Sequence, residues 1–101
     1  VDRNCLQMDG RCEDVMPMDP IDGKFEAFGW KAITIDGHDM TQVVRSLESA
    51  RDMTCGPVCI VANTVKGKGV SYMEDVRAWH GKVPTAGEFE TALADIEASC
   101  K

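Results

Sequence analysis

One histidine follows a glycine-rich loop that could bring it against a ligand. An apolar run, Val58 to Val65, leads into Lys66-Gly67-Lys68-Gly69, and Ala78-Trp79-His80-Gly81 follows a few residues later. Glycines let a backbone approach a ligand closely or adopt positive φ. A histidine can donate a hydrogen bond to an anion or move a proton near neutral pH. The pattern predicts an anion-facing loop after a strand; a packed, hydrogen-bonded histidine beside the tryptophan is the alternative.

The amino-terminal half supplies a strand, a loop and a helix ahead of a second strand. Residues 1–3 resemble the tail of a strand, and residues 4–19 form a long loop. The next helix is predicted to have Asp19 as its N-cap, Pro20 in its first turn and Gly29 as its stop. A short strand follows at residues 31–35. The apolar face predicted for this helix comprises Ile21, Phe25 and Phe28.

Two further helices are marked by capping signals. Asp39 with Gln42 predicts the start of the first, and Thr85 with Glu88 the start of the second. The strand 58–65 between them is apolar on both faces, as in a parallel sheet covered by helices. The buried stripe predicted for the first of these helices is Met40, Val43, Val44, Leu47 and Ala50. The inward residues predicted for the last helix are Phe89, Leu93 and Ile96.

This order of elements predicts an α/β fold with a parallel sheet. Ligands of such sheets sit at the carboxyl ends of the strands. Asn4 and the loop 66–69 both follow predicted strand ends, so we expect both near the ligand. Asn in such a place is also a common turn former, and the residues alone leave both roles open.

The length and the net charge of the chain limit the classes of function that it can have. The chain has 101 residues, 44% of them hydrophobic, and a net charge of −6. The length fits one domain. The negative net charge argues against nucleic-acid binding, which requires clustered Lys and Arg. No apolar run approaches the roughly 18 residues of a membrane span. The chain opens with Val1 on a strand, so we expect a piece of a longer polypeptide. The cysteines, at positions 5, 12, 55, 59 and 100, are expected to be reduced thiols of a cytoplasmic protein.

Four motifs in unbroken order resemble the transketolase family. They are Val1 to Gly10, Phe28 to Asp39, the lysine-glycine loop, and Ala78-Trp79-His80-Gly81. The closest likeness is to the amino-terminal, diphosphate-binding section, found as a separate subunit in many bacteria and archaea. The resemblance implies a three-layer thiamine-diphosphate-binding fold, with residues 1–101 forming only the carboxyl-terminal part of the diphosphate-binding domain.

The resemblance assigns three site residues. It implies that the Asn4 amide oxygen and the Leu6 backbone carbonyl ligate Mg²⁺, whose other ligands are cofactor phosphates and water. His80 would contact the cofactor diphosphate and the substrate hydroxyls and help to move a proton. Cys5 replaces the glycine common in close relatives. His38 has no such support and is expected in a turn, while Lys66 and Lys68 could be surface lysines or phosphate contacts.

The implied activity is transfer of a two-carbon ketol unit between phosphorylated sugars, as in the pentose phosphate pathway. It would require thiamine diphosphate, Mg²⁺ and a pyrimidine-binding domain or subunit, in a homodimer or heterotetramer, so the isolated piece should be inactive. Two alternatives stay open. One is a deoxyxylulose-phosphate-synthase-like thiamine enzyme, which shares the Lys-Gly-x-Gly loop although Ala78 to Gly81 favour transketolase. The other is a non-catalytic phosphate-binding α/β module.

Overall fold

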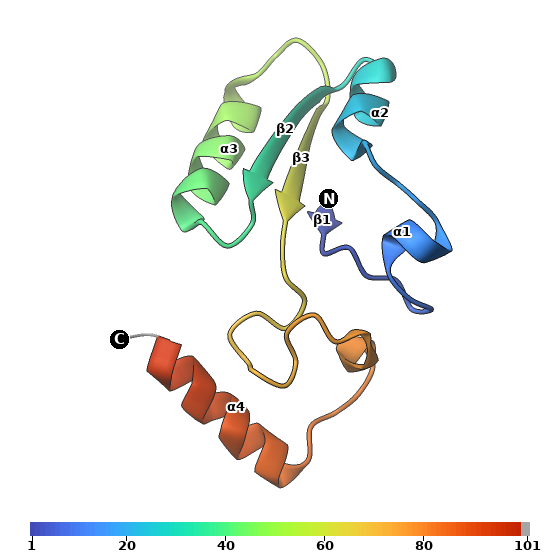
Figure 1. Cartoon of the computed structure of the whole chain (residues 1–101). Coiled ribbons are helices and arrows are strands. Elements are labelled where there is room, and N and C mark those ends of the chain that lie inside the picture. Colours follow the sequence, from blue (N-terminus) through green and yellow to red (C-terminus); the bar gives the residue numbers. More distant parts are fainter. Residues whose placement is uncertain (100–101) are drawn as a thin grey trace. The chain divides into compact units, whose positions relative to one another are not determined.

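The computed structural model describes residues 1–99, and they form two compact units (Figure 1). The first unit contains Val1–Asn4 and Met16–Thr64. The second contains Cys5–Val15 and the described residues from Val65 onward. The chain therefore passes between the units at residues 4–5, 15–16 and 64–65.

The first unit is built on a parallel sheet of three strands, as predicted. They are β1 (Asp2–Arg3), β2 (Lys31–Asp36) and β3 (Val58–Asn63), in the order β1-β3-β2. Asn63 pairs with Arg3 on one side and with Asp36 on the other. These are the last residues of their strands, so all three strands end on the same rung. The central strand stops two residues before the predicted Val65.

Helices α2 (Ile21–Ala27) and α3 (Met40–Asp52) cover this sheet. Both contact β2, and Figure 1 shows them on opposite sides of the sheet. The α/β layering inferred from the sequence is therefore confirmed. The buried apolar residues of the sheet are Ile35, Cys59 and Val61.

The start of α2 differs from the prediction. Its N-cap is Pro20, with extended backbone and no side-chain cap. Asp19 does not cap the helix because its carboxylate accepts hydrogen bonds from the Arg3 guanidinium, with Nε 2.9 Å from Oδ1. That pairing lowers the pKa of Asp19. The end of α2 is as predicted, since Gly29 follows it at φ +81°.

The predicted apolar faces of the helices are only partly buried. On α3, Val43 and Ala50 are half-buried as expected, but Met40, Val44 and Leu47 are exposed, and Ser46 is the buried residue. Ser46 can face the sheet because its hydroxyl donates to the Val43 carbonyl at 2.9 Å. Small residues let a helix approach its neighbour closely, which turns the larger ones outward. The other exposed exceptions are Phe28, Phe89, Leu93 and Ile96.

The second unit consists of loops, short helices and one long helix. The loop 5–15 ends in a short helix, α1 (Cys12–Val15), which the sequence did not predict. A 3₁₀ helix, η1 (Arg77–His80), precedes α4 (Ala86–Ser99), in which Ala92 is buried. The predicted capping box of α4 is confirmed: the Thr85 amide donates to Glu88 Oε2 at 2.8 Å, and the Glu88 amide donates to Thr85 Oγ1 at 3.3 Å.

Three features bear on the class of protein. Within residues 1–99, none of the helices has the length and apolar character needed to cross a membrane. Cys5, Cys12, Cys55 and Cys59 carry free thiols, and Cys100 lies outside the described residues. No group of three or more His, Cys, Asp or Glu side chains in the described part could hold a metal ion.

Candidate diphosphate and metal site

Asn4 lies at the carboxyl edge of the sheet, one residue past β1. The strand ends at Arg3, whose guanidinium donates to Asn63 Oδ1 at 3.1 Å across the last rung. The neighbouring turn after β2 passes close to the end of β3. A Cβ on Gly37 would lie 2.5 Å from Cγ2 of Thr64. Only glycine fits there, so the edge that carries Asn4 is tightly built.

Leu6 lies in a hairpin-like loop opposite Arg11. The two hydrogen bonds of this bridge join the Gln7 amide to the Gly10 carbonyl at 2.8 Å and the Cys12 amide to the Cys5 carbonyl at 2.9 Å. These bonds on either side of Leu6 fix the course of the backbone whose carbonyl is expected to ligate the metal. Cys5 has φ +61°, which favours glycine and accounts for the glycine expected at this position.

The lysine-glycine loop turns sharply after the strand. Gly67 and Gly69 have φ +71° and +92°. A Cβ on Gly67 would meet Met73 at 2.6 Å, whereas one on Gly69 would meet nothing within 4 Å. Lys68 lies 3.4 Å from Glu74 Oε1. Its charge is therefore partly balanced, which weakens the case for Lys68 as a dedicated phosphate contact.

His80 is exposed at the end of η1. Among residues 1–99, its imidazole takes part in no hydrogen bond or ion pair. The residue that packs is its neighbour: Trp79 Nε1 donates to the Tyr72 carbonyl at 3.1 Å, and the two rings lie 5.1 Å apart. Among the described residues it is therefore Trp79, and not His80, that is packed and hydrogen-bonded.

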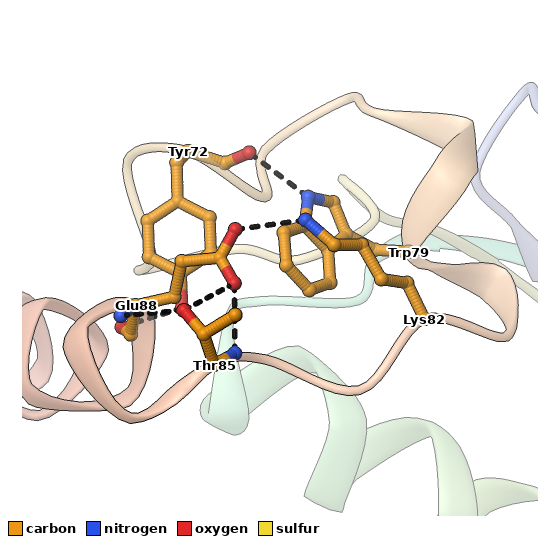
Figure 2. A network of polar contacts seen from close by, with 5 residues as sticks. All are labelled: Tyr72, Trp79, Lys82, Thr85 and Glu88. Carbon is orange, nitrogen blue, oxygen red and sulfur yellow. Dashed lines mark hydrogen bonds and ion pairs between the residues drawn. The ribbon is translucent and has the colours of Figure 1, made fainter.

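A polar network holds the Trp79 ring to the start of α4 (Figure 2). Lys82 Nζ lies 4.1 Å from the ring centroid and donates to Glu88 Oε1 at 2.8 Å. The Tyr72 hydroxyl donates to the Glu88 carbonyl at 2.7 Å. The Lys82 ammonium and the Thr85 donors hold the pKa of Glu88 at about 2, and burial raises the pKa of Tyr72. The loop that ends at His80 is therefore anchored on both sides of Trp79.

The predicted site residues are divided between the two units. The segments bearing Leu6 and His80 belong to the second unit, and Asn4 belongs to the first. His38 lies in the turn before α3, where its amide donates to Asp36 Oδ1 at 2.9 Å, so its prediction as a turn residue is confirmed.

Sequence reasoning missed the residues that join the Leu6 and His80 segments. They are Arg11, Asp75 and Arg77, whose contacts span 64 and 69 positions. No local pattern in the sequence indicates such distant partners.

The chain matches the family model described as "Transketolase, thiamine diphosphate binding domain" over residues 1–95. It is 38% identical over 96 residues to one subunit of the apulose-4-phosphate transketolase of Phocaeicola vulgatus, covering 95% of this chain and 34% of that protein. It is 36% identical to the 6-deoxy-6-sulfo-D-fructose transketolase subunit SqwG of a Clostridium species, with coverages of 95% and 35%. The chain thus spans about a third of these curated relatives.

The fold also has close counterparts among solved structures. A transketolase of Pichia stipitis in complex with sedoheptulose 7-phosphate superimposes with a TM-score of 0.83 over 95% of this chain and 14% of that one, at 20% identity. The parallel sheet with helices packed against it defines an α/β domain. The chain belongs to the transketolase family, within its thiamine diphosphate-binding domain.

Proposed function

We propose that residues 1–101 form part of the diphosphate-binding domain of a transketolase that depends on thiamine diphosphate and Mg²⁺ and transfers a two-carbon ketol unit between phosphorylated sugars. The family match over residues 1–95 is the observation that carries this proposal. The relatives named as transketolase subunits support a further proposal. A pyrimidine-binding domain or partner subunit completes a cytoplasmic homodimer or heterotetramer.

The oxygen donors of the chain fit the metal of such a cofactor. Mg²⁺ prefers hard oxygen ligands and keeps several positions for phosphates and water. Asn4 offers an amide oxygen directly after β1, at the sheet edge where ligands of this fold class bind. Leu6 offers a backbone carbonyl two residues further on, in the bridged part of the loop. We assign these two residues as the metal ligands contributed by this chain.

His80 is the proposed catalytic residue. Bound thiamine diphosphate would supply the electron sink that carbon–carbon bond cleavage beside a carbonyl requires. The exposed imidazole can donate from one ring nitrogen to a diphosphate oxygen and present the other to a sugar hydroxyl. From there it can hold or accept that hydroxyl's proton. Gly81 leaves open space beside it, since an added Cβ there meets nothing within 4 Å.

Titration calorimetry with thiamine diphosphate and Mg²⁺ tests the proposal. The full-length protein with its partner should bind the cofactor and transfer ketol units among a panel of phosphorylated ketoses and aldoses. Residues 1–101 alone should bind weakly or not at all and should show no activity. Micromolar binding by residues 1–101 alone would contradict the partial-site proposal. A full-length protein that ignores the cofactor would contradict the function itself.

A further inference from the structure

Two arginines reach in opposite directions between the loop 5–15 and the segment that bears His80. Arg11 extends from the loop and donates from Nη1 and Nη2 to Asp75 Oδ2 at 3.1 and 3.3 Å. Arg77 extends back from η1 and donates from Nη1 to the Met8 carbonyl at 3.0 Å. We call these three side chains and that carbonyl the clasp. All four belong to the second unit.

The clasp is attached at both ends to well-defined backbone. Arg11 stands opposite Leu6 in the bridge of the loop, so a displacement of one is transmitted to the other. Asp75 has φ +56°, a conformation that Asp tolerates better than most residues. Its amide donates to the Lys66 carbonyl at 2.9 Å. The Asp75 carboxylate therefore links the Leu6 loop to the lysine-glycine loop.

The helical geometry of η1 relates Arg77 to His80. In a 3₁₀ helix the side chains at positions i and i+3 lie above one another. Arg77 and His80 are three residues apart in η1 and therefore leave it on the same side. Arg77 uses that side to reach Met8 in the loop 5–15. The imidazole thus emerges on the side of η1 that faces the loop bearing Leu6.

We propose that Arg11 and Arg77 are positioning residues that fix the Leu6 carbonyl relative to the His80 imidazole. The inference rests on the proposed function, in which one of these groups ligates the metal and the other serves the diphosphate and the substrate. A fixed separation lets both act on one cofactor without ordering the loop at each binding event. Loss of the clasp should therefore weaken metal-dependent cofactor binding more than turnover.

The strength of the clasp contacts determines how much cofactor affinity should fall when one of them is removed. Arg11 and Asp75 are about half exposed, at 47% and 51%, and exposed ion pairs contribute little on their own. Both contacts are charge-assisted because each donor is a guanidinium; Arg11 donates to a carboxylate and Arg77 to a neutral carbonyl. We expect Arg11→Met and Arg77→Met each to raise the dissociation constant of the cofactor at fixed Mg²⁺ by about fivefold. Turnover at saturating cofactor and Mg²⁺ should change less than twofold.

The first experiment tests the clasp without any cofactor. Hydrogen exchange of the Gln7 and Cys12 amides, which close the Leu6 bridge, is measured in the full-length protein. Both arginine variants should exchange about fivefold faster than the parent. Arg51→Met is the matched control, because Arg51 pairs with Asp52 at 2.9 Å on the surface of α3. Exchange rates equal to those of the control would overturn the clasp, whether or not the protein binds thiamine diphosphate.

The second experiment tests positioning. Calorimetric titration of the same variants at several Mg²⁺ concentrations should give the fivefold weakening, with turnover preserved at saturation. Arg77→Lys, which keeps one charged donor, should recover most of the affinity. Faster exchange with unchanged cofactor affinity would leave the clasp merely structural and overturn the proposal. A parent protein that does not bind the cofactor refutes the proposed function and, with it, the positioning role; the exchange result for the clasp stands separately.

Discussion

The Lys82 ammonium group lies 4.1 Å from the centroid of the Trp79 ring and is also hydrogen-bonded to Glu88. One cation thus connects the residue beside His80 to the first turn of α4. On its other side the indole donates to the Tyr72 carbonyl. The backbone position of His80 is therefore set by its neighbours, which leaves the imidazole available for a ligand.

Trp79→Phe tests this anchoring. The change keeps an aromatic ring under Lys82 but removes the hydrogen bond to Tyr72. We expect the free energy of unfolding to fall by about 1 kcal/mol, measured by urea denaturation of the full-length protein. Trp30→Phe is the control, since Trp30 packs edge-on against Phe25 and its indole nitrogen makes no hydrogen bond within residues 1–99. Equal losses in both variants would show that the Tyr72 contact contributes nothing.

Glu88→Gln tests the electrostatics of the same network through pH. The folded-state pKa of Glu88 is about 2, below its ordinary value of 4.5. Its ionised form therefore stabilises the fold above pH 4.5, and this contribution disappears as the pH falls toward 2. Thermal unfolding across this window should show a flatter pH dependence for Glu88→Gln than for the parent. Glu48→Gln, on α3 and outside the network, should follow the parent; identical profiles for all three would refute the assignment.

The two histidines provide a direct comparison of catalytic roles. In the full-length enzyme His80→Ala should lower turnover by roughly 100-fold or more, as expected for loss of a positioned acid–base group. Cofactor affinity should change less. His38→Ala should be close to neutral, because His38 lies in the turn before α3. Steady-state kinetics with separate cofactor titrations make the comparison, and a damaging His38→Ala beside a silent His80→Ala would reverse the assignment.

Asn4→Ala addresses the metal. The substitution removes a proposed Mg²⁺ ligand without touching the reacting atoms. We expect a higher Mg²⁺ concentration for half-maximal cofactor binding and partial recovery of turnover at saturation. Calorimetry over a range of Mg²⁺ concentrations measures the shift. If turnover collapses while cofactor affinity is unchanged, Asn4 has another role.

Local chemistry explains what could be predicted from the sequence. Asp39 caps α3 by accepting from the amides of Thr41 and Gln42 at 2.8 and 3.2 Å, an interaction within three residues of sequence. Thr85 and Glu88 act likewise at α4. Parallel pairing was predictable because the apolar run that forms β3 requires helices on both faces. Such short-range rules also placed Asn4 past a strand end.

Long-range contacts explain what could not be predicted. Asp19 had the sequence signature of an N-cap, but its carboxylate instead accepts a hydrogen bond from Arg3, sixteen positions away. The burial of Ser46 in place of Leu47 depends on how α3 sits on the sheet, which helical periodicity alone leaves undetermined. The helix η1 carries no capping signal, and its first residue, Arg77, is fastened to Met8 from 69 positions away.

Substitution by alanine should have different consequences at two of the glycines near the proposed site. At Gly67 a methyl group would collide with Met73, and the backbone is left-handed, so the loop itself would suffer. At Gly81 φ is −138° and the space ahead is open, so the fold should accept alanine readily. If a Gly81→Ala protein keeps its stability but loses affinity for the cofactor or the substrate, the loss would therefore show that the ligand approaches the backbone at this position.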